Sequence, residues 1–139
     1  MRILITGGCG FIGSNLAIFL KGKIKNVKIT SIDNLSRKGS QLNHKRLSGK
    51  GIKNFKINIV DSNKLIKLPK FDLIIHCAAE PAIEVSRKKT EKVFKSNLVG
   101  TFNVLQKCAK DKSNIIYMSS SRVYAIENLL DLKKKGFIN

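Results

Sequence analysis

The sequence predicts an α/β fold, a doubly wound parallel sheet with helices on both faces. Short β-branched runs alternate along the chain with longer segments of helical period. The runs are apolar throughout, which is typical of parallel strands covered on both faces. The alternation of strands with helices implies right-handed crossovers. With 139 residues, the chain has the length of one domain.

The expected elements follow in chain order. Five strands are expected, at Arg2–Thr6, Val27–Asp33, Phe55–Val60, Phe71–Cys77 and Asn114–Ser119. The first helix is expected over Phe11–Lys23, with an apolar face formed by Phe11, Ile12, Leu16, Phe19 and Leu20. A long helix ending near Lys110–Lys112 is outlined by Val93, Leu98, Phe102 and Leu105.

Charge and composition exclude several classes of function. The formal net charge is +18, but 22 of the 27 basic residues are lysines. Proteins that recognise the phosphates and bases of nucleic acids favour arginine. The lysines are spread along the chain and aromatic residues make up only 6%, so nucleic acid ranks last among the expected partners. No apolar run approaches the roughly 18 residues of a membrane span, so no membrane partner is expected.

The cysteines indicate neither disulfides nor a metal site. Cys9, Cys77 and Cys108 are odd in number and widely spaced, and they form no CxxC pair. The N-terminus runs directly into glycines and has no signal-peptide core. We therefore expect a cytoplasmic protein without a bound metal.

The strongest motif follows the first expected strand. Gly7, Gly10 and Gly13 are spaced G-x-x-G-x-x-G between a strand and a helix, the context that a dinucleotide-binding fingerprint requires. Gly7 would permit a tight turn, Gly10 would let the backbone approach a pyrophosphate, and Gly13 would let the helix pack on the strand. The helix N-terminus at Phe11 and Ile12 would face the diphosphate. The sequence therefore predicts a Rossmann-type dinucleotide site.

An acid at the end of the second strand supports this prediction. Asp33 lies 20 positions beyond Gly13, where a carboxylate would accept hydrogen bonds from the adenosine ribose and repel a 2′-phosphate. This favours NAD over NADP. Arg37 and Lys38 follow closely, and a basic group there could hold the extra phosphate, so NADP stays open.

Together, the motifs resemble the NAD-dependent epimerase/dehydratase family of extended short-chain dehydrogenases. The resemblance rests on Thr6–Asn15, Ile32–Ser36, His76–Ala79, Asn97–Thr101 and Ser119–Tyr124. It implies transient oxidation of a nucleotide sugar by bound NAD. Asp33–Gly39 most resembles the CDP-paratose (CDP-tyvelose) 2-epimerases, which favours a CDP-sugar as substrate. Many members pair through the long helix, so a homodimer is also implied.

The resemblance implies a role for each matched residue. The pyrophosphate would be bound by Gly7, Gly10, Phe11, Ile12 and Gly13. The adenosine ribose would be bound by Asp33 and Asn34, and the adenine by Asn58, with Asp61 as the alternative. Ala78 and Ala79 would lie beside the nicotinamide half. Ser120 would hydrogen-bond the sugar hydroxyl that is oxidised.

The family's Tyr–Lys pair, spaced Y-x-x-x-K, has no match in the sequence. Tyr117 is followed four positions later by Ser121, and Tyr124 by Asn128. We therefore expect residues 1–139 to be an incomplete NAD(P)-binding Rossmann domain, C-terminally truncated and without the substrate lobe, that is inactive alone. The alternatives are a non-catalytic dinucleotide-binding remnant or pseudoenzyme and, ranked below it, a basic nucleic-acid-binding protein.

Three further polar residues receive structural interpretations. His76 ends an apolar run, and we expect a histidine whose nitrogens are satisfied within the fold rather than a catalytic base or a metal ligand. Glu80 and Glu84 lie four residues apart, and we expect them on a solvated face.

Overall fold

The chain forms one parallel sheet with its strands in the order β3-β2-β1-β4-β5. The computed structural model describes residues 1–80, 89–119, 130 and 136. The strands are β1 (Arg2–Thr6), β2 (Lys28–Asp33), β3 (Lys53–Lys56), β4 (Leu73–His76) and β5 (Asn114–Tyr117), and every neighbouring pair is parallel. This is the strand order of a Rossmann sheet, so the predicted fold class is confirmed.

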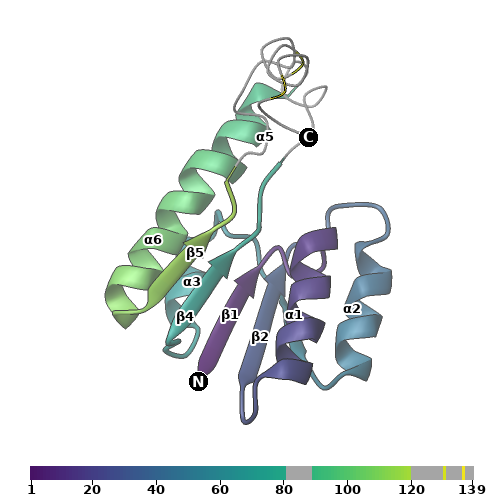
Figure 1. Ribbon diagram of the computed structural model, residues 1–139. Helices are drawn as coiled ribbons and strands as arrows, with labels where there is room; N and C mark the ends of the chain where they lie inside the picture. Colours follow the sequence, from purple (N-terminus) through teal and green to yellow (C-terminus); the bar gives the residue numbers. More distant parts are fainter. Residues whose placement is uncertain (81–88, 120–129, 131–135, 137–139) are drawn as a thin grey trace.

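Helices cover both faces of the sheet (Figure 1). They are α1 (Phe11–Lys23), α2 (Ser40–Gly49), α3 (Ser62–Lys67), α5 (Thr90–Phe94) and α6 (Gly100–Asp111), with a π-helical turn, Lys95–Val99, joining the last two. α1 and α2 lie on one face of the sheet, and α3 and α6 lie on the other (Figure 1). α1 has the bounds that the sequence predicts.

Two hydrophobic cores, one on each face, explain why the middle of the central strand is apolar. Ile3 and Ile5 of β1 pack with Ala17 of α1 and other residues of the first core. Leu4, which points to the opposite face, belongs to the second core with residues of α3, β4 and α6. Because the middle of β1 is buried on both sides, its successive side chains Ile3, Leu4 and Ile5 are all apolar.

The third strand is shifted from its expected position, Phe55–Val60. It begins at Lys53 and ends at Lys56, and Phe55 is 44% exposed. β3 lies at the edge of the sheet, where only one neighbouring strand is available, so its side chains need not be apolar. The apolar residues that suggested a longer strand fall in the loop after it, where Ile59 is buried against Gly100 at the start of α6.

The buried faces of two helices also differ from the expected apolar stripes. In α1 the buried residues are the small Gly13, Ser14 and Ala17, whereas Phe11 and Phe19 are exposed. Small residues let the helix approach the strands closely. Of the predicted apolar face, Leu16 and Leu20 are partly buried against the first core, whereas Phe11, Ile12 and Phe19 are exposed, so the prediction holds only in part.

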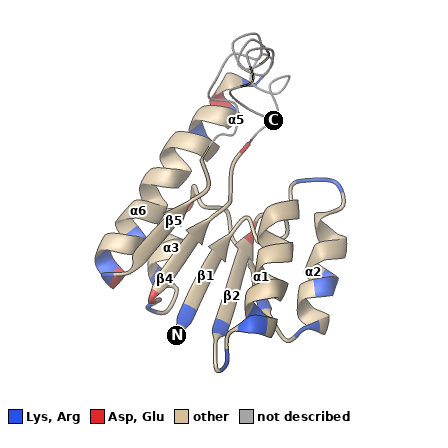
Figure 2. Ribbon diagram, in the orientation of Figure 1, with Lys and Arg blue, Asp and Glu red and all other residues tan. Residues whose placement is uncertain are grey.

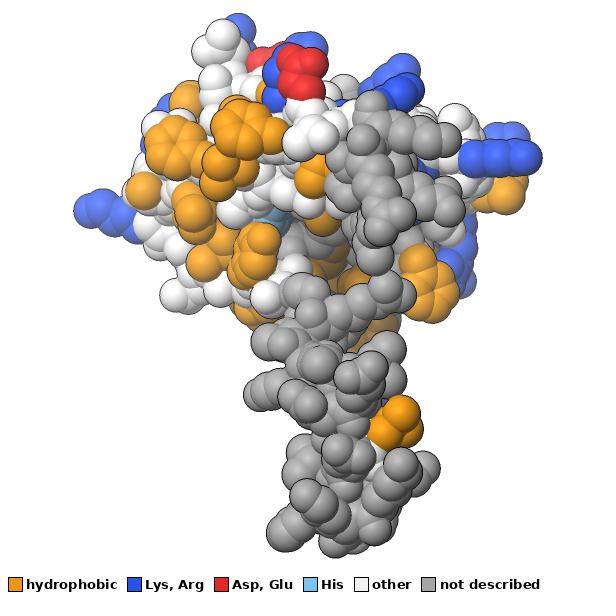
Figure 3. Space-filling model, turned by 90° about the horizontal axis from the view of Figure 1, so that it is seen from above, with side chains coloured by type: hydrophobic (Ala, Val, Ile, Leu, Met, Phe, Trp, Pro, Cys, Tyr) orange, Lys and Arg blue, Asp and Glu red, His pale blue; other side chains and the backbone are white. Residues whose placement is uncertain are grey.

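On α6, the polar Asn103, Lys107 and Asp111 are buried beside Val104 and Cys108, while other apolar side chains are exposed. Asn103 donates to the carbonyl oxygens of Ile59 and Val60, both at 3.0 Å, and so fixes the loop after β3. The side chains of Phe94, Leu98, Phe102 and Leu105 are exposed; we call these four residues the α5–α6 stripe. Hydrophobic side chains gather on the left of Figure 3, the side on which α6 and β5 lie in Figure 1.

A buried ion pair ties α6 to the segment before β4. The Lys107 ammonium is 2.8 Å from Asp111 Oδ1 and donates to the carbonyl oxygens of Leu68 and Pro69 at 3.0 and 3.1 Å. Asp111 Oδ2 accepts the Phe71 N–H at 3.1 Å. Lys107 and Asp111 are 1% and 4% exposed, so each charge depends on the other for its stability.

Outside such pairs, the basic residues lie on several helices, strands and loops instead of one stripe (Figure 2). Within the part of the chain that the structure describes, no helix combines the length and the apolar character needed to cross a membrane.

Asp111→Asn should lower the free energy of unfolding by about 3 kcal/mol, because it leaves the buried Lys107 charge without its counter-ion. Urea unfolding followed by circular dichroism measures the loss. The matched control is Glu91→Gln, which breaks the exposed i,i+4 pair between Glu91 and Lys95 and should cost less than about 0.5 kcal/mol. Equal losses in the two variants would show that burial does not govern these pairs.

Candidate functional site

A cavity of about 710 Å³ opens at the carboxyl ends of the strands, where the order of the sheet reverses between β1 and β4. Ligands of doubly wound proteins bind at this point of the sheet. The predicted cofactor residues that line the cavity are Gly7, Gly10, Phe11, Asp33, Asn34, Asn58, Ala78 and Ala79. Ile12 and Gly13 are not among its described lining residues.

The glycine-rich turn is packed backbone against backbone. Gly7 has a φ of +66°, and a Cβ on it would lie 2.7 Å from the Cα of Ala78, just after β4. A Cβ on Gly13 would overlap the carbonyl oxygen of Gly7. The Gly10 N–H donates to that same oxygen at 3.0 Å. Gly13 is therefore buried beneath the turn and shapes it, while Gly7 and Gly10 face the cavity.

Asp33 is held at the end of β2 by two backbone hydrogen bonds. Its Oδ2 accepts the Cys9 N–H at 3.0 Å, and its Oδ1 accepts the Leu35 N–H at 2.8 Å. Each carboxylate oxygen has a second lone pair, so Asp33 can still accept hydrogen bonds from a ligand in the cavity. Burial, and next the Asp33 charge, raise the pKa of the Cys9 thiol to about 12, so this thiol stays neutral.

The structure separates the two candidates for the adenine contact. Asn58 lines the cavity. Asp61 caps α3, where its carboxylate accepts the Lys64 N–H at 3.1 Å and pairs with the Lys64 ammonium at 3.0 Å. Hydrogen bonds from Lys64 lower the pKa of the Asp61 carboxyl. Of the two candidates, Asn58 is thus the one among the described residues that line the cavity.

His76 has a partner on each ring nitrogen. Its Nδ1 is 2.6 Å from the hydroxyl of Thr6, and its Nε2 is 3.0 Å from the hydroxyl of Thr101 on α6. The Thr6 hydroxyl also accepts the Ala78 N–H at 3.3 Å. Burial lowers the pKa of His76 to about 4, so the ring is neutral at pH 7. His76 is satisfied within the fold, as the sequence indicates, and its contacts reach the backbone that follows β4.

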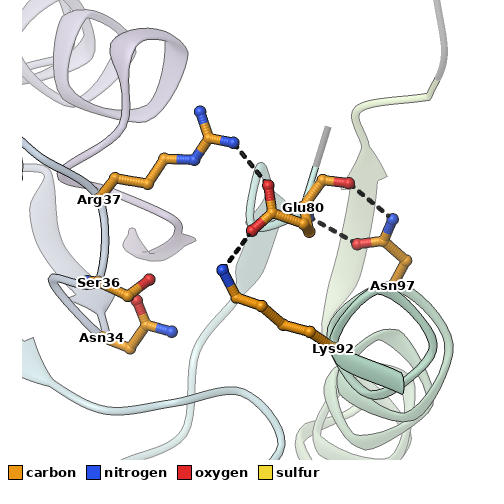
Figure 4. A network of polar contacts seen from close by, with 6 residues as sticks. All are labelled: Asn34, Ser36, Arg37, Glu80, Lys92 and Asn97. Carbon is orange, nitrogen blue, oxygen red and sulfur yellow. Dashed lines mark hydrogen bonds and ion pairs between the residues drawn. The ribbon is translucent and has the colours of Figure 1, made fainter. Parts of the chain in front are cut away.

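For Glu80, the expected solvated face is wrong. Its side chain is only 7% exposed, and its carboxylate lies 2.7 Å from both Arg37 and Lys92 (Figure 4). Its backbone N–H donates to Asn97 Oδ1 at 2.7 Å, and its carbonyl oxygen accepts from Asn97 Nδ2 at 3.1 Å. Glu84 lies outside the described residues.

The partners of Glu80 come from segments that periodicity cannot bring together. Arg37 is in the loop after β2, Lys92 is on α5, and Asn97 is in the π-helical turn. Burial raises the pKa of the Glu80 carboxyl, but hydrogen bonds from Lys92 and Arg37 outweigh burial and lower the pKa overall. The signal available in the sequence was the position of Glu80, an acid four positions after the end of β4, the strand at the switch point.

Two predicted features are not described by the structure. Ser120, the residue expected at the sugar hydroxyl, lies outside the described residues, and so does Tyr124. Among the residues that are described, no group of three or more His, Cys, Asp and Glu side chains could hold a metal ion.

Comparison with known proteins gives the same assignment as the motifs. The model of the "NAD dependent epimerase/dehydratase family" matches residues 3–134. A dTDP-D-glucose 4,6-dehydratase of Dictyostelium discoideum is 40% identical and a CDP-paratose 2-epimerase of Salmonella typhi 39% identical, over 88% and 89% of this chain. The chain spans only 30% and 38% of the length of these two curated relatives.

A solved structure has the same fold. The UDP-glucose 4-epimerase of Bifidobacterium longum, solved in complex with NAD+ and UDP, is 27% identical with a TM-score of 0.75. The likeness covers 90% of this chain and 38% of that protein. The two proteins therefore share the arrangement of their helices and strands as well as part of their sequence.

Gly13→Ala should destabilise the protein by about 1–3 kcal/mol, because the added methyl group overlaps the turn backbone. Gly22→Ala is the matched control in the same helix, since a Cβ there meets nothing within 4 Å. It should stabilise the protein by about 0.5–1 kcal/mol through helix propensity. Urea unfolding of both variants tests the opposite signs, and a stabilised Gly13→Ala would contradict the close packing.

The low pKa of His76 should make the protein sensitive to acid. An unfolded histidine binds a proton below its ordinary pKa of 6.5, but the folded ring resists protonation until about pH 4. The free energy of unfolding should therefore fall by about 3 kcal/mol as the pH drops from 6.5 to 4. Unfolding curves across this range, with His76→Asn as the variant that lacks the titrating group, measure the effect. A His76→Asn protein with the same pH dependence would refute the assignment.

Proposed function

The chain belongs to the NAD dependent epimerase/dehydratase family, and from this membership we propose that its cavity binds the adenosine diphosphate part of NAD. The family's description as NAD dependent confirms the predicted cofactor at the level of the family. The observation that carries the proposal for this chain is the Asp33 carboxylate, fixed against the glycine-rich turn and facing the same cavity.

The residues around the cavity fit the parts of a dinucleotide. The N–H groups of Gly8, Cys9 and Gly10 are bonded within the fold. The first turn of α1, whose N-cap Gly10 has no capping side chain, would therefore present its N–H groups to a diphosphate at the positive end of the helix. Asp33 offers acceptors to the ribose hydroxyls, and Asn58 offers an amide to the adenine. Ala78 and Ala79 have small side chains that leave room for the cofactor to pass. Bound NAD would supply the hydride acceptor for the family's chemistry.

We propose a nucleotide sugar as the substrate of a complete enzyme carrying this domain. The two curated relatives act on dTDP- and CDP-sugars by name, and the structural neighbour was solved with UDP. The motif Asp33–Gly39 favours a CDP-sugar. Oxidation of the sugar hydroxyl requires a base of the Tyr–Lys type, and the sequence has no Y-x-x-x-K. We therefore expect this chain alone to bind NAD without turnover.

Two further expectations stay predictions. A homodimer is supported by the α5–α6 stripe, because apolar side chains exposed along one helix face are suited to burial against a second copy. The cytoplasmic location is supported by the three free cysteines, Cys9, Cys77 and Cys108.

Titration calorimetry with NAD tests the proposed binding. The wild-type chain should release heat on binding, and Asp33→Asn should weaken the affinity about tenfold, because it removes a charge-assisted acceptor. Asp61→Asn is the control, since Asp61 caps α3 away from the cavity and should leave the affinity unchanged. No heat at millimolar NAD from a folded sample would overturn the binding proposal. Epimerisation of any CDP-, UDP- or dTDP-sugar by this chain would overturn the expected lack of turnover.

A further inference from the structure

The described part of the cavity wall is far less basic than the chain as a whole. The chain has 27 basic and 9 acidic residues, but the described residues that line the cavity include a nearly equal number of each sign. The basic side chains in the lining are Arg37, Lys38, Lys92 and Lys95, and the acidic ones are Asp33, Glu80 and Glu91. Among the described residues, the wall of this cavity is therefore close to neutral in a strongly cationic protein.

Glu80 neutralises more of the positive charge in the lining than any other described acidic residue there. Its one buried carboxylate pairs with two of the four cations, Arg37 through Oε1 and Lys92 through Oε2, each at 2.7 Å. Its backbone is clamped by both groups of the Asn97 amide, so the carboxylate cannot easily turn away (Figure 4). Glu91 pairs with Lys95 at 2.6 Å, but the Glu91 side chain is 77% exposed.

Arg37 is held at a position where its charge would matter for a ligand. It lies four residues after Asp33, and both residues line the cavity. The loop between them is fixed by hydrogen bonds from the N–H of Leu35 to Asp33 and from the N–H of Ser36 to Asn34. The Arg37 carbonyl accepts the Ser40 hydroxyl at 2.7 Å. These hydrogen bonds fix the backbone of Arg37, so only its side chain can turn from one partner to another.

A basic group beside the ribose acid is what distinguishes sites for NADP from sites for NAD. The 2′-phosphate of NADP adds negative charge at the adenosine ribose, and an arginine near the acid can hold it with charge-assisted hydrogen bonds. Asp33 repels this phosphate, whereas Arg37 would attract it. The preference of the site depends on whether the Arg37 guanidinium is available.

We propose that Glu80 is a specificity-determining residue, which selects NAD over NADP by holding Arg37 and Lys92 away from a 2′-phosphate. The inference rests on the proposed function, since it requires the adenosine ribose to lie at Asp33. Glu80 acts through the cations, and a 2′-phosphate would have to compete with its carboxylate for them. Asp33 and Glu80 thus oppose NADP in different ways, the first by repulsion and the second by neutralising the cations nearby.

A purely structural role for Glu80 makes a different prediction. Glu80 joins the loop after β2 to α5 across the cavity, so its loss could loosen the cavity walls. Loosening would weaken NAD and NADP alike, whereas the loss of a specificity residue changes the ratio of their affinities. The ratio of the two dissociation constants is therefore the decisive readout.

The experiment compares Glu80→Gln with Glu91→Gln in the full chain, by calorimetry with NAD and with NADP. Both variants remove one negative charge from the lining of the same cavity, but only the first releases Arg37. Glu80→Gln should lower the ratio of the NADP to the NAD dissociation constant about tenfold, the size of one charge-assisted hydrogen bond. Glu91→Gln should change this ratio by less than about twofold, because its carboxylate is exposed and screened.

Arg37→Gln provides a second test. The Arg37 side chain is 54% exposed, so we expect this variant to fold. Its measurement in the wild-type background does not depend on the folding of Glu80→Gln. In the wild-type background Arg37→Gln should leave the ratio within about twofold, and in the Glu80→Gln background it should reverse the gain in NADP affinity. An unchanged ratio in Glu80→Gln, or a selective loss of NADP binding in Arg37→Gln alone, would overturn the inference while NAD binding by the wild type stands. Absence of NAD binding by the wild type would overturn the proposed function and the inference with it.

Discussion

The site depends on one close approach of backbone to backbone. The turn after β1 lies directly against the residue that follows β4, and α1 lies directly against that turn, so Gly7 and Gly13 have no room for a side chain. This packing sets the distance between the two strand ends at the switch point of the sheet. The cavity exists because β1 and β4 send their following segments to opposite faces from this tightly packed junction.

Buried polar side chains then fix the loops around the junction. His76 connects Thr101 of α6 to Thr6, and Thr6 in turn holds the backbone of Ala78. Asn103, also on α6, holds the loop after β3. Each of these groups is satisfied inside the fold, which is the condition under which a polar group can be buried without a large loss of stability. α6 therefore serves as a scaffold for two walls of the cavity.

The charge of the chain has different consequences at the surface and at the site. Most lysines in the described part of the chain are exposed, and the basic residues are distributed over several elements (Figure 2). At physiological ionic strength each exposed charge is screened over about 8 Å. At the cavity, the buried carboxylate of Glu80 pairs with Arg37 and Lys92, whose side chains are half exposed, so only the carboxylate end of each pair is shielded from salt. Lys107 and Asp111 form a second ion pair with a buried carboxylate, and this pair anchors α6 to the segment before β4.

The sequence by itself determined the fold class, the bounds of β1 and α1, and the glycine-rich turn with Asp33, because these depend on local spacing and on backbone conformations that few residues permit. Only the tertiary structure decided which helix faces are buried, where β3 ends, and that Asn58 rather than Asp61 lines the cavity. Glu80 is the clearest case, since its partner Arg37 lies 43 positions earlier in the chain. Periodicity describes one segment at a time, whereas the environment of a charged side chain depends on which distant segments the sheet brings together.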